Sequence, residues 1–204
     1  MDRKFITLLE ALILYAVIFL PGLSGSSWPL WNLSYLTVHI VPSMALLILI
    51  AYYHGYKDKL LALPQRNDLL SFLIALPALV LSGILVSSIP FDAPRPDTIV
   101  ARDDMQSIII LCLSCIGGAY FEEMFFRFYL VGRLGKALNN TIAALLISVV
   151  LFTACHAYEG LHGMVNAAVS ATILSFIFIR YRCIHGIALA HAGYNIIAYL
   201  LLLE

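Results

Sequence analysis

Long apolar segments limit what this chain can fold into more than any other feature of its sequence. Crossing a bilayer takes about 20 apolar residues per helix, and runs of that length recur along nearly the whole chain. We expect seven membrane-spanning helices, at residues 5–23, 33–53, 69–90, 105–130, 138–158, 163–180 and 183–203. Because only helices and closed barrels satisfy their backbone polar groups in lipid, the chain is predicted to be an all-α, polytopic membrane protein.

The composition supports this fold class. Charged residues make up 12% of the 204 residues and hydrophobic residues 62%, whereas soluble domains carry about 25% charged residues. The formal net charge is zero, so nothing indicates a nucleic-acid partner. The partner that the composition predicts is the lipid bilayer.

A polar connector at residues 90–104, rich in proline and aspartate, divides the chain. Three plain spans precede the connector, and the four spans after it hold nearly all the unusual polar residues. We therefore predict one membrane domain over residues 1–204, with accessory spans in 1–90 and a catalytic four-helix core in 105–203.

The basic residues predict the orientation of the chain, because cytoplasmic loops carry an excess of lysine and arginine. With the N-terminus inside, only Arg95 and Arg102 fall on the outer side. The basic residues on the inner side are Arg3, Lys4, Lys57, Lys59, Arg66, Arg127, Arg133, Lys136, Arg180 and Arg182. We expect a cytoplasmic N-terminus and an external C-terminus.

Three clusters of polar or aromatic residues stand out in the last four spans, where each charged residue costs about 2.5–3.5 kcal/mol. They are Glu122, Glu123 and Arg127 in the fourth span, Phe152 and His156 in the fifth, and His191 and Asn195 in the seventh. Residues four apart share a helix face, so Glu123 can pair with Arg127. Glu122 points about 100° away from Glu123 around the helix, which leaves Glu122 available for chemistry.

These residue types suit peptide hydrolysis. The reaction needs a base to activate water, donors for the oxyanion and an acid for the leaving amine. The chain has no serine in a nucleophile-elbow context and no His-Glu-x-x-His motif. Each cluster also has a structural interpretation: an ion pair that anchors a helix end at the membrane surface, a packing histidine, or an asparagine that joins two helices.

The three motifs E-E-x-x-x-R, F-x-x-x-H and H-x-x-x-N, in this order, resemble the CPBP (CAAX protease and bacteriocin-processing) family of intramembrane proteases. The type II CAAX prenyl endoprotease is a member of that family. The similarity covers roughly residues 105–200. One departure is Phe128, where the family often has glycine directly after the arginine.

The resemblance implies a glutamate-dependent endopeptidase and a role for each matching residue. Glu122 would activate the water, His156 would hold or polarise it, and His191 and Asn195 would form the oxyanion pocket. The supporting residues would be Glu123, Arg127 and Phe152. Two histidines and a carboxylate could also hold zinc, but asparagine is a poor zinc ligand, so we favour a site without metal or cofactor.

The resemblance also implies a substrate and a location. Relatives act on lipidated or membrane-anchored protein tails, so the expected partner is such a tail. The small size is typical of a prokaryotic member in the cytoplasmic membrane, and the myxosortase-like subgroup is the one that we expect.

Two other functions remain open. An ion- or proton-coupled transporter also uses intramembrane glutamate and histidine, but it would show internal symmetry, which is not visible here. A catalytically silent scaffold or immunity protein would have no reason to keep all four catalytic candidates. The predicted boundaries place His156 near the outer end of its span and Glu122 and His191 deeper. The face that admits substrate therefore stays undecided.

Overall fold

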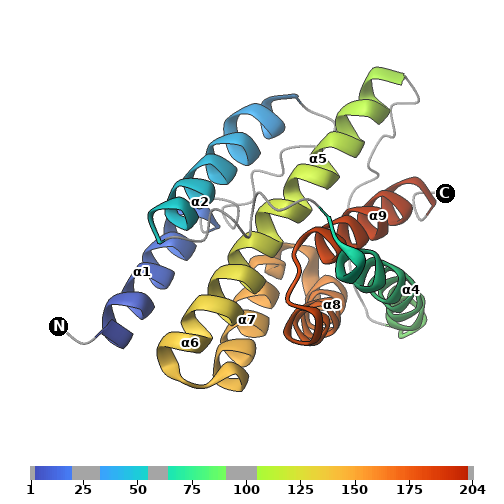
Figure 1. The fold of residues 1–204 in the computed structure, drawn as a ribbon. Helices are drawn as coiled ribbons and strands as arrows, with labels where there is room; N and C mark the ends of the chain where they lie inside the picture. The colour runs from blue at the N-terminus through green and yellow to red at the C-terminus, as the bar shows by residue number, and fades with distance from the viewer. Residues whose placement is uncertain (1–2, 20–32, 55–63, 91–104, 202–204) are drawn as a thin grey trace.

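The computed structural model describes residues 3–19, 33–54, 64–90 and 105–201, and the regular structure in these ranges is helical. Its elements are α1 (Arg3–Ile18), η2 (Tyr35–Ile40), α2 (Val41–Tyr53), α4 (Arg66–Ser87), α5 (Met105–Glu123), η3 (Met124–Leu134), α6 (Gly135–Leu138), α7 (Thr141–Cys155), η4 (Ala157–Glu159), α8 (Gly160–Tyr181) and α9 (His185–Leu201). α5, η3 and α6 form one continuous helix over Met105–Leu138, which we call the central rod. It crosses the centre of Figure 1, with α1 and α2 to its left and α4 and α9 to its right.

The described helices overlap all seven predicted segments, but they are not all long enough to cross a membrane. Four are long and apolar enough within the described residues: Tyr35–Tyr53, Arg66–Ser87, Met105–Leu138 and Ala157–Tyr181. Thr141–Cys155 is apolar but shorter, and α1 and α9 have 16 and 17 residues. The predicted all-α membrane fold is confirmed: within the described residues, four helices are long and apolar enough to cross a membrane, and shorter helices lie beside them. The total of seven spans stays a prediction.

The rod that carries the two glutamates is longer than predicted. It continues to Leu138, whereas the apolar pattern stops near residue 130 because glycines and basic residues follow. The rod ends where Asn139 adopts the left-handed conformation, with φ 55°. Asn140 then caps α7 by accepting a hydrogen bond from the Ala143 backbone N–H at 3.0 Å. The hydropathy pattern shows only where the apolar residues stop, whereas the helix itself ends at its capping residues, several positions later.

Several residues used to predict the orientation lie outside the described ranges. These are Lys57, Lys59, Arg95 and Arg102, together with the connector at 90–104 apart from Pro90. The orientation in the membrane therefore stays a prediction.

Many of the remaining basic residues gather at one end of the molecule. A Cβ on Gly132 would lie 3.6 Å from the Phe178 ring, and Cys183 Sγ lies 3.4 Å from the Asn67 carbonyl oxygen. These contacts join the ends of η3, α8 and α4. We call this region the basic end; its members are Arg66, Arg133, Lys136, Arg180 and Arg182.

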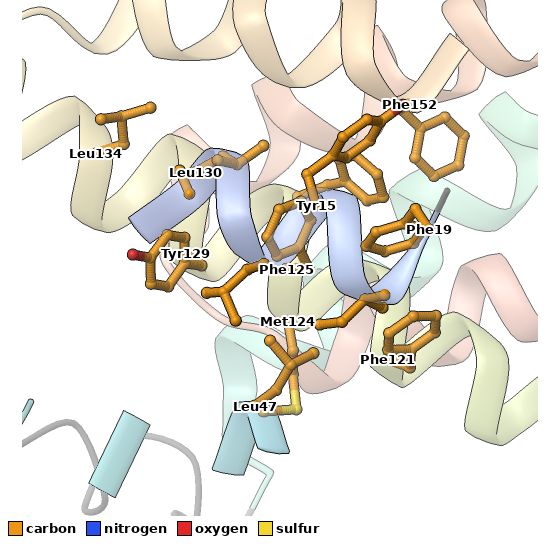
Figure 2. Packing of buried hydrophobic residues seen from close by; sticks show 14 of the residues in the cluster. Tyr15, Phe19, Leu47, Phe121, Met124, Phe125, Tyr129, Leu130, Leu134 and Phe152 are labelled. Atoms are coloured by element: carbon orange, nitrogen blue, oxygen red, sulfur yellow. The ribbon is translucent and has the colours of Figure 1, made fainter. Parts of the chain in front are cut away.

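Aromatic side chains hold α1 against η3 and α7, as Figure 2 shows. The Phe19 ring lies 4.9 Å from the Phe121 ring and 4.8 Å from the Phe126 ring, and the Phe126 ring lies 4.9 Å from Phe152. In lipid, close packing of this kind drives helix association, because the surrounding acyl chains are as apolar as the helices. The cluster fixes η3 between the two helices.

On the other side of the rod, α4 packs directly on α9. A Cβ on Gly186 would collide with the Asp68 carbonyl oxygen, so only glycine permits this approach. The Gly186 N–H donates to Asp68 Oδ1 at 3.1 Å. α4 therefore holds the start of α9 in place, although the sequence groups it with the accessory spans. The division into accessory spans and catalytic core stays a prediction.

Candidate active site

A buried ion pair lies at the junction of α5 and η3. Arg127 Nη1 donates a hydrogen bond to Glu123 Oε1 at 2.9 Å, and both side chains are fully buried. The pair therefore forms as the four-residue spacing predicts. Because it lies inside the bundle, the alternative interpretation as an anchor at the membrane surface is wrong.

His191 on α9 joins this pair from across the bundle. Its Nδ1 lies 2.9 Å from Glu123 Oε1, and its Nε2 lies 3.8 Å from Glu122 Oε2. One oxygen of Glu123 thus faces donors from both Arg127 and His191. We call Glu123, Arg127 and His191 the buried trio.

Glu122 lies beside the buried trio but differs from Glu123 in its surroundings. The Glu122 side chain is 23% exposed, whereas that of Glu123 is 0% exposed. The charge of Glu122 interacts with those of His191, His156 and Arg127. Its carboxylate is therefore accessible and lies close to both histidines, whereas Glu123 is enclosed by its partners.

His156 caps the end of α7, where its imidazole is fixed by the preceding turn. Its Nδ1 lies 2.8 Å from the Phe152 carbonyl oxygen, and the two rings lie 4.6 Å apart. A carbonyl oxygen only accepts hydrogen bonds, so Nδ1 carries the proton in this contact. In the neutral imidazole, Nε2 then keeps its lone pair and can accept a proton.

His156 lies near Glu122, although the predicted span boundaries place the two residues at different depths. Glu122 interacts electrostatically with His156, and Phe152, one turn before His156, lies against both Arg127 and His191. The two residues therefore belong to one site, and their depth in the membrane stays a prediction.

Phe152 connects the two histidines with the arginine. The Arg127 guanidinium carbon lies 4.7 Å from the centre of the Phe152 ring, within the range of a cation–π contact. The Phe152 and His191 rings lie 6.1 Å apart. The structure thus brings Glu122, Glu123, Arg127, Phe152 and His191 together, with His156 next to Phe152.

Asn195 lies one helical turn beyond His191 on α9 and is half-buried. This position agrees with the shared face that the spacing predicts. Its role in an oxyanion pocket stays a prediction.

Tyrosines near Glu122 were not identified from the sequence. Tyr35 on η2, Tyr158 on η4 and Tyr199 on α9 all interact electrostatically with the Glu122 carboxylate. Their positions depend on packing between distant segments. Tyrosine is also common at membrane interfaces, so no pattern in the sequence distinguishes these three.

The site has the donor types of a metal centre but not the arrangement. Within the described ranges, no group of three His, Cys, Asp or Glu side chains is placed to hold a metal ion. The Nδ1 atoms of His156 and His191 face Phe152 and Glu123, which leaves one nitrogen on each ring. Chemistry without a metal stays a prediction.

Comparison with known proteins finds a family match for the part of the chain that holds this site. Residues 104–197 match the family model of the Rce1-like type II CAAX prenyl endopeptidases. No curated protein and no solved structure matches the chain significantly. The matched segment contains all three motifs on which the resemblance to CPBP proteases rests. Residues 104–197 are therefore similar to Rce1-like type II CAAX prenyl endopeptidases, a protease family, and this similarity together with the apolar helices indicates an integral membrane protein.

Proposed function

We propose that this protein is an intramembrane endopeptidase in which Glu122 activates water. The observation that carries the proposal is the position of His191, which contacts Glu123 and faces Glu122 across 3.8 Å. A contact of this length is too long for a direct hydrogen bond, and a water beside both groups can connect them. A water held there would lie against the one carboxylate of the site that is partly exposed.

In this mechanism, Glu122 takes a proton from the water as its oxygen attacks the peptide carbonyl carbon. His156 Nδ1–H donates its hydrogen bond to the Phe152 carbonyl oxygen and leaves Nε2 as an acceptor, so His156 can orient the same water. After the C–N bond breaks, Glu122 returns the proton to the leaving amine. We assign both the base and the acid role to Glu122, because its carboxylate is not held by the buried trio.

The developing oxyanion needs hydrogen-bond donors. We assign them to the Asn195 side-chain amide and to Nε2–H of a protonated His191. The contact of His191 Nδ1 with the Glu123 carboxylate fixes the ring so that Nε2 faces Glu122. The charges then balance: Glu122 and Glu123 contribute two negative charges, and Arg127 and His191 two positive ones. Buried charges need such compensation.

The burial of the site favours a substrate that enters the membrane. Glu123 and Arg127 are fully buried in the bundle, so the peptide bond must be brought to them. A C-terminal membrane anchor or lipidated tail would place a nearby bond at this depth. We propose such a tail as substrate, in the cytoplasmic membrane of a prokaryote, and a myxosortase-like role is the form to test first.

The test is co-expression of the protein with tagged, membrane-anchored tail substrates. We expect cleavage by the wild type and a loss of about 10²–10⁴-fold in Glu122→Gln, which removes the base. Glu122→Gln should remain folded and lose less stability than Glu123→Gln, because Glu122 is partly exposed and is not part of the buried trio. Cleavage by Glu122→Gln at the wild-type rate would overturn the assignment of the base.

A matched control is Glu159→Gln, which changes a glutamate on η4 outside the three motifs. We expect this variant to cleave like the wild type. If neither the wild type nor Glu159→Gln cuts any tail while both are folded, the transporter and scaffold functions take precedence over the protease.

A further inference from the structure

The first helix brings one polar side chain to the end of α7. Tyr15 on α1 is 8% exposed. Its hydroxyl donates a hydrogen bond to the Leu151 carbonyl oxygen at 3.1 Å and accepts one from the Cys155 thiol at 3.3 Å. Leu151 and Cys155 are four residues apart, which is about one helical turn. The hydroxyl of Tyr15 therefore contacts both ends of the last turn of α7.

The same turn holds the imidazole of His156. α7 ends at Cys155, and the His156 backbone N–H bonds to the Thr153 carbonyl oxygen at 3.1 Å instead of continuing the helix. The Phe152 carbonyl oxygen thus lacks the backbone donor that a longer helix would give it. His156 Nδ1–H takes this place at 2.8 Å. The direction of the imidazole therefore depends on the shape of the last turn of α7.

Packing explains the ring of Tyr15 but not its hydroxyl. The ring lies 5.7 Å from that of Phe19 and 6.4 Å from that of Phe125, within the aromatic cluster of Figure 2. Phenylalanine would fill the same space. A buried phenol usually has a hydrogen-bond partner, and inside a membrane bundle there is no bulk water to supply one. The hydroxyl is therefore explained by the group that it binds, the end of α7.

We propose that Tyr15 is a positioning residue for His156. Its hydroxyl fixes the last turn of α7, and the Phe152 carbonyl oxygen in that turn fixes the imidazole. The inference rests on the proposed function, in which His156 orients the water that Glu122 activates. α1 lies outside the matched residues 104–197, so a helix without any motif residue contributes to the site.

Tyr129 on η3 offers a matched control. It is 4% exposed, its ring also lies against Phe125 at 5.9 Å, and its hydroxyl accepts a hydrogen bond from Arg133 at 3.0 Å. Tyr15→Phe and Tyr129→Phe remove the same group from the same aromatic cluster. Only Tyr15→Phe removes a hydrogen bond to α7. A role in packing alone would give the two variants the same behaviour.

The first measurement is hydrogen exchange of the full chain in detergent, followed by mass spectrometry. In Tyr15→Phe, we expect the backbone amides of residues 151–156 to exchange about fivefold faster, because the turn has lost one hydrogen bond. In Tyr129→Phe, the same amides should exchange at the wild-type rate. Unchanged exchange in Tyr15→Phe, or an equal increase in both variants, would overturn the proposal.

The second measurement is the rate at which each variant cleaves a tagged, membrane-anchored tail, recorded over a range of tail concentrations in detergent. For Tyr15→Phe, we expect kcat to fall about tenfold with KM unchanged, because a misdirected imidazole no longer orients the water but takes no part in binding the tail. Tyr129→Phe should keep both constants. A higher KM at unchanged kcat, or an equal fall of kcat in both variants, would overturn the positioning role.

The two measurements separate this inference from the proposed function. The exchange experiment needs no substrate, so it tests the contact between α1 and α7 whether or not a tail is cut. If the wild type cuts tails and both variants cut them equally well, only the role of Tyr15 fails. If the wild type cuts none while exchange still rises in Tyr15→Phe, the protease function fails, and with it the catalytic purpose of the contact.

Discussion

The molecule contains the same three side chains in two different environments. In the buried trio, Glu123 Oε1 lies 2.9 Å from both Arg127 Nη1 and His191 Nδ1. A second set, Glu10, His54 and Arg133, lies nearer the surface, and we call it the peripheral trio. There, Glu10 Oε1 lies 2.7 Å from Arg133 Nη1 and 2.9 Å from His54 Nε2. The local chemistry is nearly identical. The difference is exposure: Glu123 and Arg127 are fully buried, whereas all three peripheral side chains are partly exposed.

This difference decides what each trio can do. In the interior, a charge that loses its partner has no water to replace it, so the three groups must stay together in one arrangement. That rigidity suits residues that hold a catalytic histidine in position. At the periphery, solvent can replace any partner, because all three side chains are partly exposed.

The largest effect on stability is expected for Glu123→Gln. Removing this carboxylate leaves Arg127 buried without a counter-charge, which costs about 3–5 kcal/mol, and takes the partner from His191 Nδ1. Thermal unfolding in detergent, followed by circular dichroism, should show a much lower midpoint, and cleavage should be lost as well. A midpoint equal to that of Glu10→Gln would erase the contrast between the two trios.

The double substitution Glu123→Leu with Arg127→Met tests whether charge burial is the cause. Apolar residues of similar volume often replace a buried ion pair without loss, so most of the stability lost in Glu123→Gln should return. Activity should not return, because His191 still lacks its acceptor. Recovery of both stability and cleavage would show that the buried trio serves packing only.

A smaller effect is expected for Phe152→Leu. The Arg127 guanidinium lies over this ring, and a desolvated cation–π contact contributes about 2 kcal/mol. The same unfolding assay should show an intermediate loss, with reduced cleavage because His156 also packs on the ring. Phe128→Leu, on η3 and outside the site, serves as the control and should leave cleavage unchanged.

The smallest effect is expected for Glu10→Gln. Ion pairs with access to solvent contribute up to about 1 kcal/mol, so the unfolding midpoint should shift only slightly and cleavage should persist. The amide oxygen can still accept a hydrogen bond from Arg133. A loss as large as that of Glu123→Gln would mean that the peripheral trio is an essential joint between α1 and the rest of the bundle.

Contacts within one helix could be predicted from the sequence. Glu123 with Arg127, and Phe152 with His156, are pairs four residues apart, and helical geometry alone brings each pair together. The all-α membrane fold followed from apolar runs for a similar reason, because the period and length of a helix in lipid are set locally.

Contacts between helices could not be predicted in this way. His191 is 68 residues from Glu123, and only the family resemblance placed them in one site. Glu10 is 123 residues from Arg133, outside the matched motifs, so nothing in the sequence indicated its partner. The end of the central rod was missed because its final turns are less apolar, although asparagine capping stops the helix only after residue 138.

The contact of Gly186 with α4 shows that the segment matched by the family model is smaller than the part of the chain that positions the site. Gly186 lies five residues before His191 on α9, and its N–H is bonded to Asp68 on α4, outside the matched residues 104–197. The position of a candidate catalytic histidine thus depends on a helix that the family model does not include. A truncated protein that begins after α4 would keep every motif yet lose the surface that sets the position of α9. Efforts to reduce this protein to a minimal enzyme should therefore begin no later than Gln65, which caps α4.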